Sequence, residues 1–208
     1  MDEKERQSAF LSALATEHFV LQTAANATVG DAAARTSLYV VSLSSSLVAM
    51  GFASRSREVF VPFAAIVLPA LFVLGIFTIV RLVDSALENM RCLTGIARIR
   101  AYYRTLTPEA GEYFAARRGR WPEASSDPSL GLGLFVALFT TSASMIAIIN
   151  SVVAGTGVAI LAGDLLTNHR TVIAVTLGAA VALILNAAFF AYERWRLSVF
   201  DSLTSEEE

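Results

Sequence analysis

The sequence predicts an all-α integral membrane protein, with four transmembrane helices arranged as two hairpins and with helices extended into the cytoplasm. The 208-residue chain is 55% hydrophobic and has a mean hydropathy of +0.58, which is too apolar for an ordinary soluble domain. Four uncharged apolar stretches occur, at 38–53, 60–80, 132–162 and 172–192. Half of the 16 basic residues lie in the central segment between the second and third stretches.

The four stretches match the thickness of a bilayer. A spanning helix needs about 20 apolar residues, because the hydrocarbon core is about 30 Å thick and a helix rises 1.5 Å per residue. The stretches 60–80 and 172–192 have this length, and uncharged residues flank the shorter stretch 38–53. A soluble bundle of deeply buried helices is the alternative, but the length of the runs and their lack of charge disfavour it.

The basic residues predict how the chain is threaded. We expect five segments: a cytoplasmic N-terminal helix (1–36), a first hairpin (37–80), a cytoplasmic helical segment (81–130), a second hairpin (131–192) and a cytoplasmic tail (193–208). The first, third and fifth segments hold 13 of the 16 basic residues. Cytoplasmic segments carry the excess of Lys and Arg, so both termini and the centre are expected inside, in a multi-pass protein of the inner (plasma) membrane.

Proline and glycine predict where the helices begin and end. No proline occurs from 8 to 53, so one long helix is expected to enter the first span. The sequence Thr-Pro-Glu-Ala at 107–110 predicts the start of a short helix that ends near Gly119. The stretch 132–162 is too long for one untilted span, so we expect Gly155-Thr156-Gly157 to bend or break its helix.

The residue types argue against several kinds of chemistry. No Asp, Glu, Lys, Arg or His lies inside the predicted spans, which disfavours proton relays, coupled transporters and voltage sensors but not a passive pore. His18 and His169 fall on opposite sides of the predicted membrane, so no metal site is expected. Cys92 is the single cysteine and cannot form an internal disulfide. We therefore expect no enzyme activity, no cofactor and no nucleic-acid partner.

Small and hydroxylated residues recur at three- and four-residue steps within the spans. Such faces usually let helices pack closely, and in an oligomer they can instead line a narrow polar path. The candidates for pore lining or packing are Thr140, Ser144, Asn150, Ser151, Ser42, Ser45, Ser46 and Asn186. The two asparagines are expected above all to form hydrogen bonds between helices. Pro69 lies midway along the second span and is a hinge candidate, with a static kink as the alternative.

The densest basic patch lies in the central segment. Arg117, Arg118, Arg120 and Trp121 form it, and they are candidates for contact with lipid headgroups or with a phosphorylated ligand. Lipid contact is the preferred interpretation, because Trp favours the membrane interface. The expected partners are the lipid bilayer, further copies of the chain and a cytosolic protein.

The order of segments resembles that of a known class of protein. A helix before the first span (17–34), a tight hairpin (37–80) and a helical extension (81–105) resemble the small SLATT-like membrane effectors of bacteria. The resemblance covers the first half of the chain and includes no diagnostic motif, and the second hairpin departs from the pattern. It implies an effector that breaches the membrane when signalled.

Two functions are consistent with these observations. The first is a homo-oligomeric membrane pore or channel-like effector with a cytoplasmic helical control region. The second is a non-conducting membrane scaffold or partner subunit that docks a cytosolic protein. A lipid-modifying enzyme is the least expected, because no set of His, Asp and Glu lies near the predicted inner surface.

Overall fold

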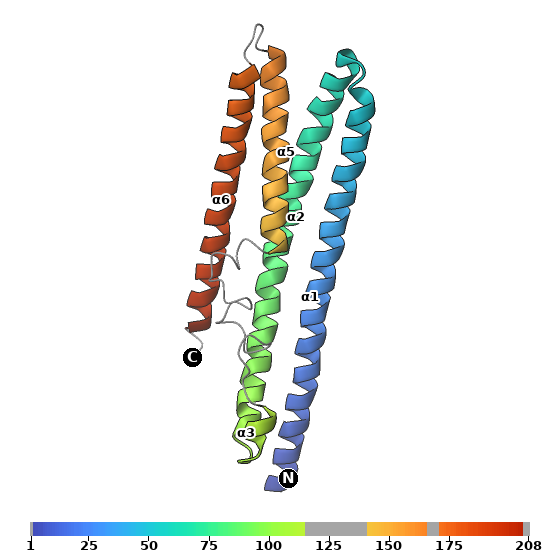
Figure 1. Ribbon diagram of the computed structural model, residues 1–208. Helices are drawn as coiled ribbons and strands as arrows, with labels where there is room; N and C mark the ends of the chain where they lie inside the picture. The colour runs from blue at the N-terminus through green and yellow to red at the C-terminus, as the bar shows by residue number, and fades with distance from the viewer. Residues whose placement is uncertain (1, 115–140, 166–170, 206–208) are drawn as a thin grey trace. The chain divides into compact units, whose positions relative to one another are not determined.

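The computed structural model describes residues 2–114, 141–165 and 171–205, and the regular elements in these ranges are helices. They are α1 (Glu3–Ala53), α2 (Arg57–Arg104), α3 (Ala110–Tyr113), α5 (Ser142–Leu165) and α6 (Thr171–Ser205) (Figure 1). The predicted all-α class is confirmed for this part of the chain. Four of the helices, α1, α2, α5 and α6, are long and apolar enough to cross a membrane.

The length of α1 follows from its cap and its composition. The backbone N–H of Glu3 donates to the Asp2 carboxylate at 2.7 Å, and the Asp2 N–H donates to Glu5 at 3.0 Å. These two hydrogen bonds satisfy backbone N–H groups that have no partner within the first helical turn. With no proline to stop it, α1 continues through Gly30 to Ala53, as predicted. The chain then reverses within three residues, and α2 begins at Arg57.

The chain folds into two compact units, and α1 and α2 contribute residues to both. One, here called the paired-helix unit, comprises Met1–Asp31 and Asp84–Leu138. The other, here called the four-helix unit, comprises Ala32–Val83 and Phe139–Glu208.

In the paired-helix unit, the start of α1 packs antiparallel to the end of α2. Phe10 meets Tyr102 edge to face, with 5.5 Å between ring centroids. Leu21 packs so closely on Gly95 that a Cβ there would lie 2.9 Å from its side chain. The Ser85 hydroxyl donates to Asp31 at 3.4 Å. Early residues of α1 therefore meet late residues of α2.

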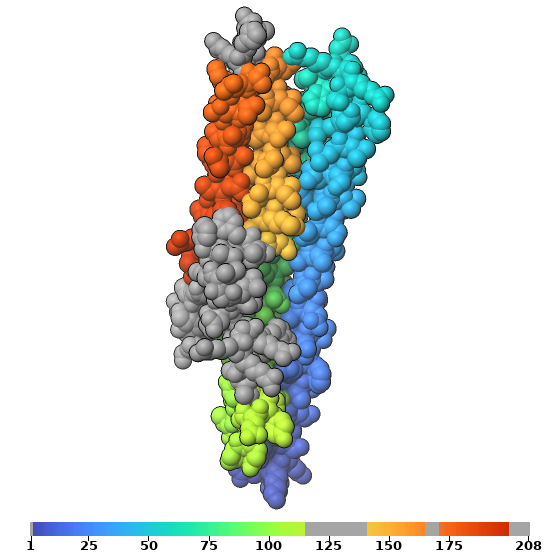
Figure 2. Space-filling view, viewed as in Figure 1, coloured from blue at the N-terminus to red at the C-terminus, as the bar shows by residue number. Residues whose placement is uncertain are grey.

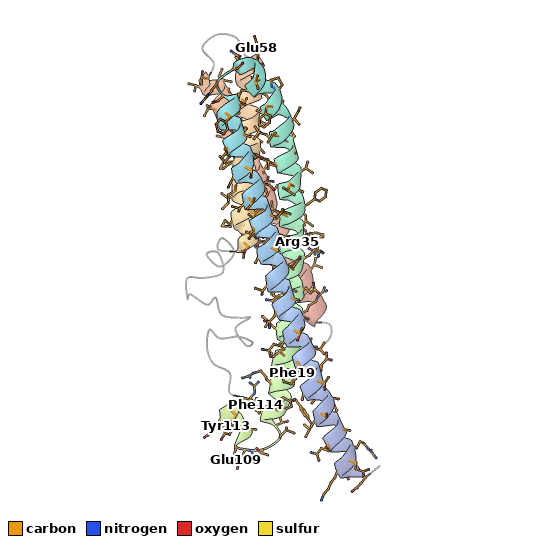
Figure 3. The ribbon with its side chains drawn as sticks, turned by 90° about the vertical axis from the view of Figure 1, so that its right-hand side faces the viewer. Phe19, Arg35, Glu58, Glu109, Tyr113 and Phe114 are labelled. Atoms are coloured by element: carbon orange, nitrogen blue, oxygen red, sulfur yellow. The ribbon has the colours of Figure 1, made fainter. Side chains whose placement is uncertain are left out.

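The short helix α3 is one turn long, so the predicted helix ending near Gly119 is wrong. It begins at Ala110 with Glu109 as its N-cap, later than the Thr107 cap that the sequence predicts, although the Thr107 hydroxyl does accept a hydrogen bond from the Ala110 N–H at 3.3 Å. Phe114 ends the turn by packing on Tyr103, with ring centroids 5.2 Å apart, while its carbonyl accepts from Arg104. Tyr113, next to it, is 80% exposed (Figure 3).

The core of the four-helix unit is apolar and joins three helices. Met50 of α1, Leu68 and Leu71 of α2, and Val153 of α5 are buried together. Large apolar side chains also point outward, among them Ile66 of α2, which is 72% exposed. Each of these helices therefore has one apolar face in the core and another on the surface of the unit.

Gly155-Thr156-Gly157 does not break the helix, since α5 is continuous from Ser142 to Leu165, so that part of the expectation is wrong. These residues instead serve packing, because α5 and α6 lie side by side (Figures 1 and 2). A Cβ on Gly155 would overlap the carbonyl oxygen of Gly178, and a Cβ on Gly178 would overlap that of Gly155. The pair of glycines allows two backbones to touch.

Candidate functional site

The polar centre of the four-helix unit is Asn150, which is 2% exposed on α5. The hydroxyl of Tyr39, fully buried on α1, donates to the Asn150 Oδ1 at 3.2 Å. The Asn150 Nδ2 donates to the backbone carbonyl of Phe72 on α2, also at 3.2 Å. One side chain thus links three helices. We call Tyr39, Phe72, Gly75 and Asn150 the Asn150 node.

Gly75 makes room for this side chain. A Cβ at Gly75 would overlap the amide group of Asn150. Any larger residue at this position would therefore displace the amide from Phe72 and Tyr39. Because a buried polar group without a partner is costly, the glycine and the two hydrogen bonds belong to one arrangement.

A second polar contact joins α5 to α6. The Ser144 hydroxyl, fully buried, lies 3.4 Å from the Glu193 carboxylate, to which it donates. Thr141 and Ser144 are also within hydrogen-bonding distance, with 2.8 Å between their hydroxyl oxygens. Glu193 is only 6% exposed. This carboxyl is therefore held inside the unit by hydroxyl groups rather than lying in a solvated tail.

Sequence reasoning did not single out Glu193, because it follows the last apolar stretch and precedes Arg194. A signal was nevertheless present. Gly178, Ala182 and Asn186 recur every four residues on α6, and continuing this stripe by seven residues leads to Glu193. The stripe is the face that α6 turns toward α5.

Three of the remaining hydroxyl candidates bond within their own helices. Ser151 is 4% exposed and donates to the Ala147 carbonyl at 2.7 Å. Ser42 and Ser45 donate to the carbonyls four residues earlier, each at 2.8 Å. Ser45 is exposed, whereas Ser42 and Ser46 are half-buried. Hydroxyls bonded in this way need neither water nor a neighbouring helix.

Asn186 lies at a groove on the surface of the α5–α6 pair. The groove has a volume of about 770 Å³ and is lined by Gly155, Thr156, Ala159, Gly178, Ala182 and Asn186 among others. The Asn186 Nδ2 donates to the Ala182 carbonyl at 3.0 Å. Its Oδ1 is buried and accepts no hydrogen bond from the described residues. A buried acceptor without a donor costs free energy, so the Asn186 amide is only partly satisfied by the described residues.

The hinge candidate Pro69 is exposed and lies within α2, which continues on both sides of it. It lines an apolar hollow of about 360 Å³. The candidates Thr140, Arg117, Arg118, Arg120 and Trp121 lie outside the described residues. The structure brings Asn150, Ser144 and Ser151 together on the buried side of α5, and it places Ser45 and Asn186 elsewhere.

Two further features complete the electrostatics. Arg57, at the start of α2, donates from its Nε to Asp164 near the end of α5 at 3.1 Å.

In the paired-helix unit Cys92 is buried. This burial raises the pKa of its thiol, and the negative charge of Glu88 raises it further. Within the ranges that the structure describes, no group of three His, Cys, Asp or Glu side chains could hold a metal ion.

No protein-family model matches the chain, no curated protein is similar to it in sequence, and no solved structure matches it in fold.

Proposed function

We propose that the four long helices cross the inner membrane as two hairpins, with both termini and the segment 81–130 in the cytoplasm. The outward side chains of the four-helix unit support this placement. Phe77, Val172 and Leu183 are each at least 67% exposed, and large apolar side chains of this kind suit a hydrocarbon solvent. The excess of basic residues in the terminal and central segments supports the orientation.

Within this placement, the proposed function is a homo-oligomeric pore or channel-like effector. The groove of the α5–α6 pair is the observation that carries the proposal. It combines small residues with Thr156 and with the unmet acceptor of Asn186. In a bilayer, turning the Asn186 side chain toward the groove would let a second copy or water inside an oligomer supply the missing donor.

The proposed polar path differs from the Ser144 face that the small-residue pattern of the sequence predicts. Ser144 and Asn150 are buried and bonded to neighbouring helices of one copy, and Ser151 is buried and bonded to its own helix, so these three side chains are already satisfied within one copy. Thr156 and Asn186 would face the path instead. The cytoplasmic helices would then control how the copies assemble.

The test is ion flux from liposomes that carry the purified protein. Wild-type vesicles are expected to leak, and Asn186→Leu is expected to reduce the flux while the oligomer is retained. Thr176→Val is the matched control, because Thr176 is exposed on α6, does not line the groove and donates to its own helix at 2.7 Å. A protein that is monomeric in mild detergent and leaves vesicles tight would refute the pore.

The second candidate is the non-conducting scaffold, which one observation favours. In the paired-helix unit, Phe19 and Tyr113 are 69% and 80% exposed (Figure 3). Exposed aromatic residues are enriched where proteins bind other proteins. For a scaffold, vesicles stay tight, and Tyr113→Ser releases a cytosolic protein that co-purifies with the wild type.

A further inference from the structure

Two adjoining hollows are lined by residues of α2, α5 and α6. The first, of about 220 Å³, is lined by Phe72, Ile79 and Val80 of α2 and by Leu185 and Tyr192 of α6. The second, of about 360 Å³, begins at Phe72 and Leu185 and continues to Ala64 and Val181. Because they share Phe72 and Leu185, we treat them as one channel, here called the α2–α6 channel.

The length of the channel matches one leaflet of a bilayer. On α6 it runs from Val181 to Tyr192, which at 1.5 Å per residue is about 17 Å. One leaflet contributes about 15 Å to the hydrocarbon core. A single extended acyl chain would therefore fit along it.

The lining suits a hydrocarbon chain. Leu68, Phe72 and Leu185 are apolar, and Asn150 and Ser151, which line the hollow of about 220 Å³, already have hydrogen-bond partners. Ser151 donates to Ala147, and Asn150 bonds to Tyr39 and Phe72. A hydrocarbon chain in the channel would leave these hydrogen bonds intact.

The end of the channel near Tyr192 carries a basic side chain, Arg196, with the buried Glu193 close by in the sequence. Arg196 lies one helical turn beyond Tyr192 on the same side of α6. Trp195 is 59% exposed, and its ring lies 6.3 Å from that of Tyr192. Tyr and Trp prefer the depth of lipid headgroups, and basic pockets between transmembrane helices on the cytoplasmic side bind anionic lipids.

We propose that the α2–α6 channel binds an anionic phospholipid of the inner leaflet, with one acyl chain along α5 and the phosphate at Arg196. Charge selects the headgroup, and the apolar lining holds the chain. The inference rests on the proposed membrane placement but not on conduction.

The experiment compares thermal unfolding of the full chain in mild detergent with and without added lipid. Phosphatidylglycerol is expected to raise the midpoint more than phosphatidylcholine with the same acyl chains, because a ligand of the folded state stabilises it. Glycerol phosphate alone is expected to have no effect. A shift of equal size with glycerol phosphate would mean that the site binds free phosphate, and the proposal fails.

Two pairs of variants on α6 locate the site. Arg196→Gln is expected to abolish the preference for phosphatidylglycerol, whereas Arg194→Gln, at the same depth on the opposite side of the helix, keeps it. Ala188→Phe fills the channel and is expected to abolish the shift with either lipid. Ala187→Phe, about 100° further round the helix at a position that does not line the channel, is its matched control.

The outcomes separate this proposal from the proposed function. Equal shifts for Arg194→Gln and Arg196→Gln would overturn the lipid site, whatever the flux assay shows. Dissociation of an oligomer by Ala188→Phe, with no lipid preference in the wild type, would mean that a second copy occupies the channel. Lipid selectivity in a protein that leaves vesicles tight would support the site and refute only the pore.

Discussion

The contact between Tyr39 and Asn150 is the part of the structure whose free energy can be measured most directly. Tyr39→Phe removes one hydroxyl and leaves the ring in place. The atoms involved are 3.2 Å apart, and the residues are 0% and 2% exposed. Hydrogen bonds between transmembrane helices contribute about 0.6 kcal/mol on average and at most about 1.7 kcal/mol in double-mutant cycles. Because both partners are fully buried, we expect a coupling energy of about 1 kcal/mol.

The two single variants should lower the free energy of unfolding by different amounts. Tyr39→Phe loses one hydrogen bond and should lower the free energy of unfolding by about 1 kcal/mol. Asn150→Leu also loses the bond to Phe72 and leaves the Tyr39 hydroxyl buried without an acceptor. Its cost should therefore be larger, at about 2–3 kcal/mol. In the double variant the loss should fall short of the sum by the coupling energy.

The assay is reversible unfolding in mixed micelles, followed by far-UV circular dichroism. Tyr102→Phe is the matched control, because Tyr102 is 37% exposed and belongs to the paired-helix unit. When Tyr102→Phe is combined with Asn150→Leu, the two losses of unfolding free energy should add to within about 0.3–0.5 kcal/mol. A coupling between Tyr39 and Asn150 that is no larger than this limit would refute the reasoning.

Three further predictions concern other parts of the molecule. Gly178→Leu should force α5 and α6 apart and cost about 1–3 kcal/mol in the same assay. Arg57→Gln should cost at most about 1 kcal/mol, because the Arg57 and Asp164 side chains are 75% and 37% exposed. Since burial and Glu88 raise the pKa of Cys92, maleimide labelling of the folded protein should accelerate at higher pH than labelling of the denatured chain. The unfolded thiol ionises first, so this residue lowers stability as the pH rises above about 8.5.

Each of these predictions has a control. Ala180→Leu, at an exposed position on α6, should be nearly neutral where Gly178→Leu is not. If Arg57→Gln lowered the free energy of unfolding by several kcal/mol, this would contradict the expectation that the exposed Arg57–Asp164 pair contributes little. Glu88→Gln should move the labelling profile of Cys92 to lower pH, and an unchanged profile would show that this charge has no influence.

The sequence predicts the helices well and their contacts poorly. Long apolar runs without proline specify α1 and α2, because helix formation depends mainly on local composition and on one apolar face. The Gly155-Thr156-Gly157 prediction failed because the effect of a glycine depends on its neighbour. Here that neighbour is Gly178 on another helix.

The candidate site was predictable only in part. Asn150 was found because an amide in an apolar run is unusual. In the sequence Tyr39 is one more residue of an uncharged span, and nothing nearby marks it as a donor, since its acceptor lies 111 residues away. Glu193 is the first charged residue after the apolar stretch 172–192, so the sequence places it in the tail. Its burial depends instead on which face of the helix it occupies.

The Asn150 node also constrains how the protein is made. Tyr39 and Gly75 leave the ribosome well before Asn150, and 111 residues separate the donor from its acceptor. At about 5–20 residues per second this delay is roughly 6 to 22 seconds. During that time the Tyr39 hydroxyl lacks the acceptor that Asn150 later supplies, and the space beside Gly75 that the Asn150 amide occupies is unfilled. A nascent chain stopped before α5 should therefore be a preferred substrate for membrane chaperones and proteases, and its release should coincide with the arrival of Asn150.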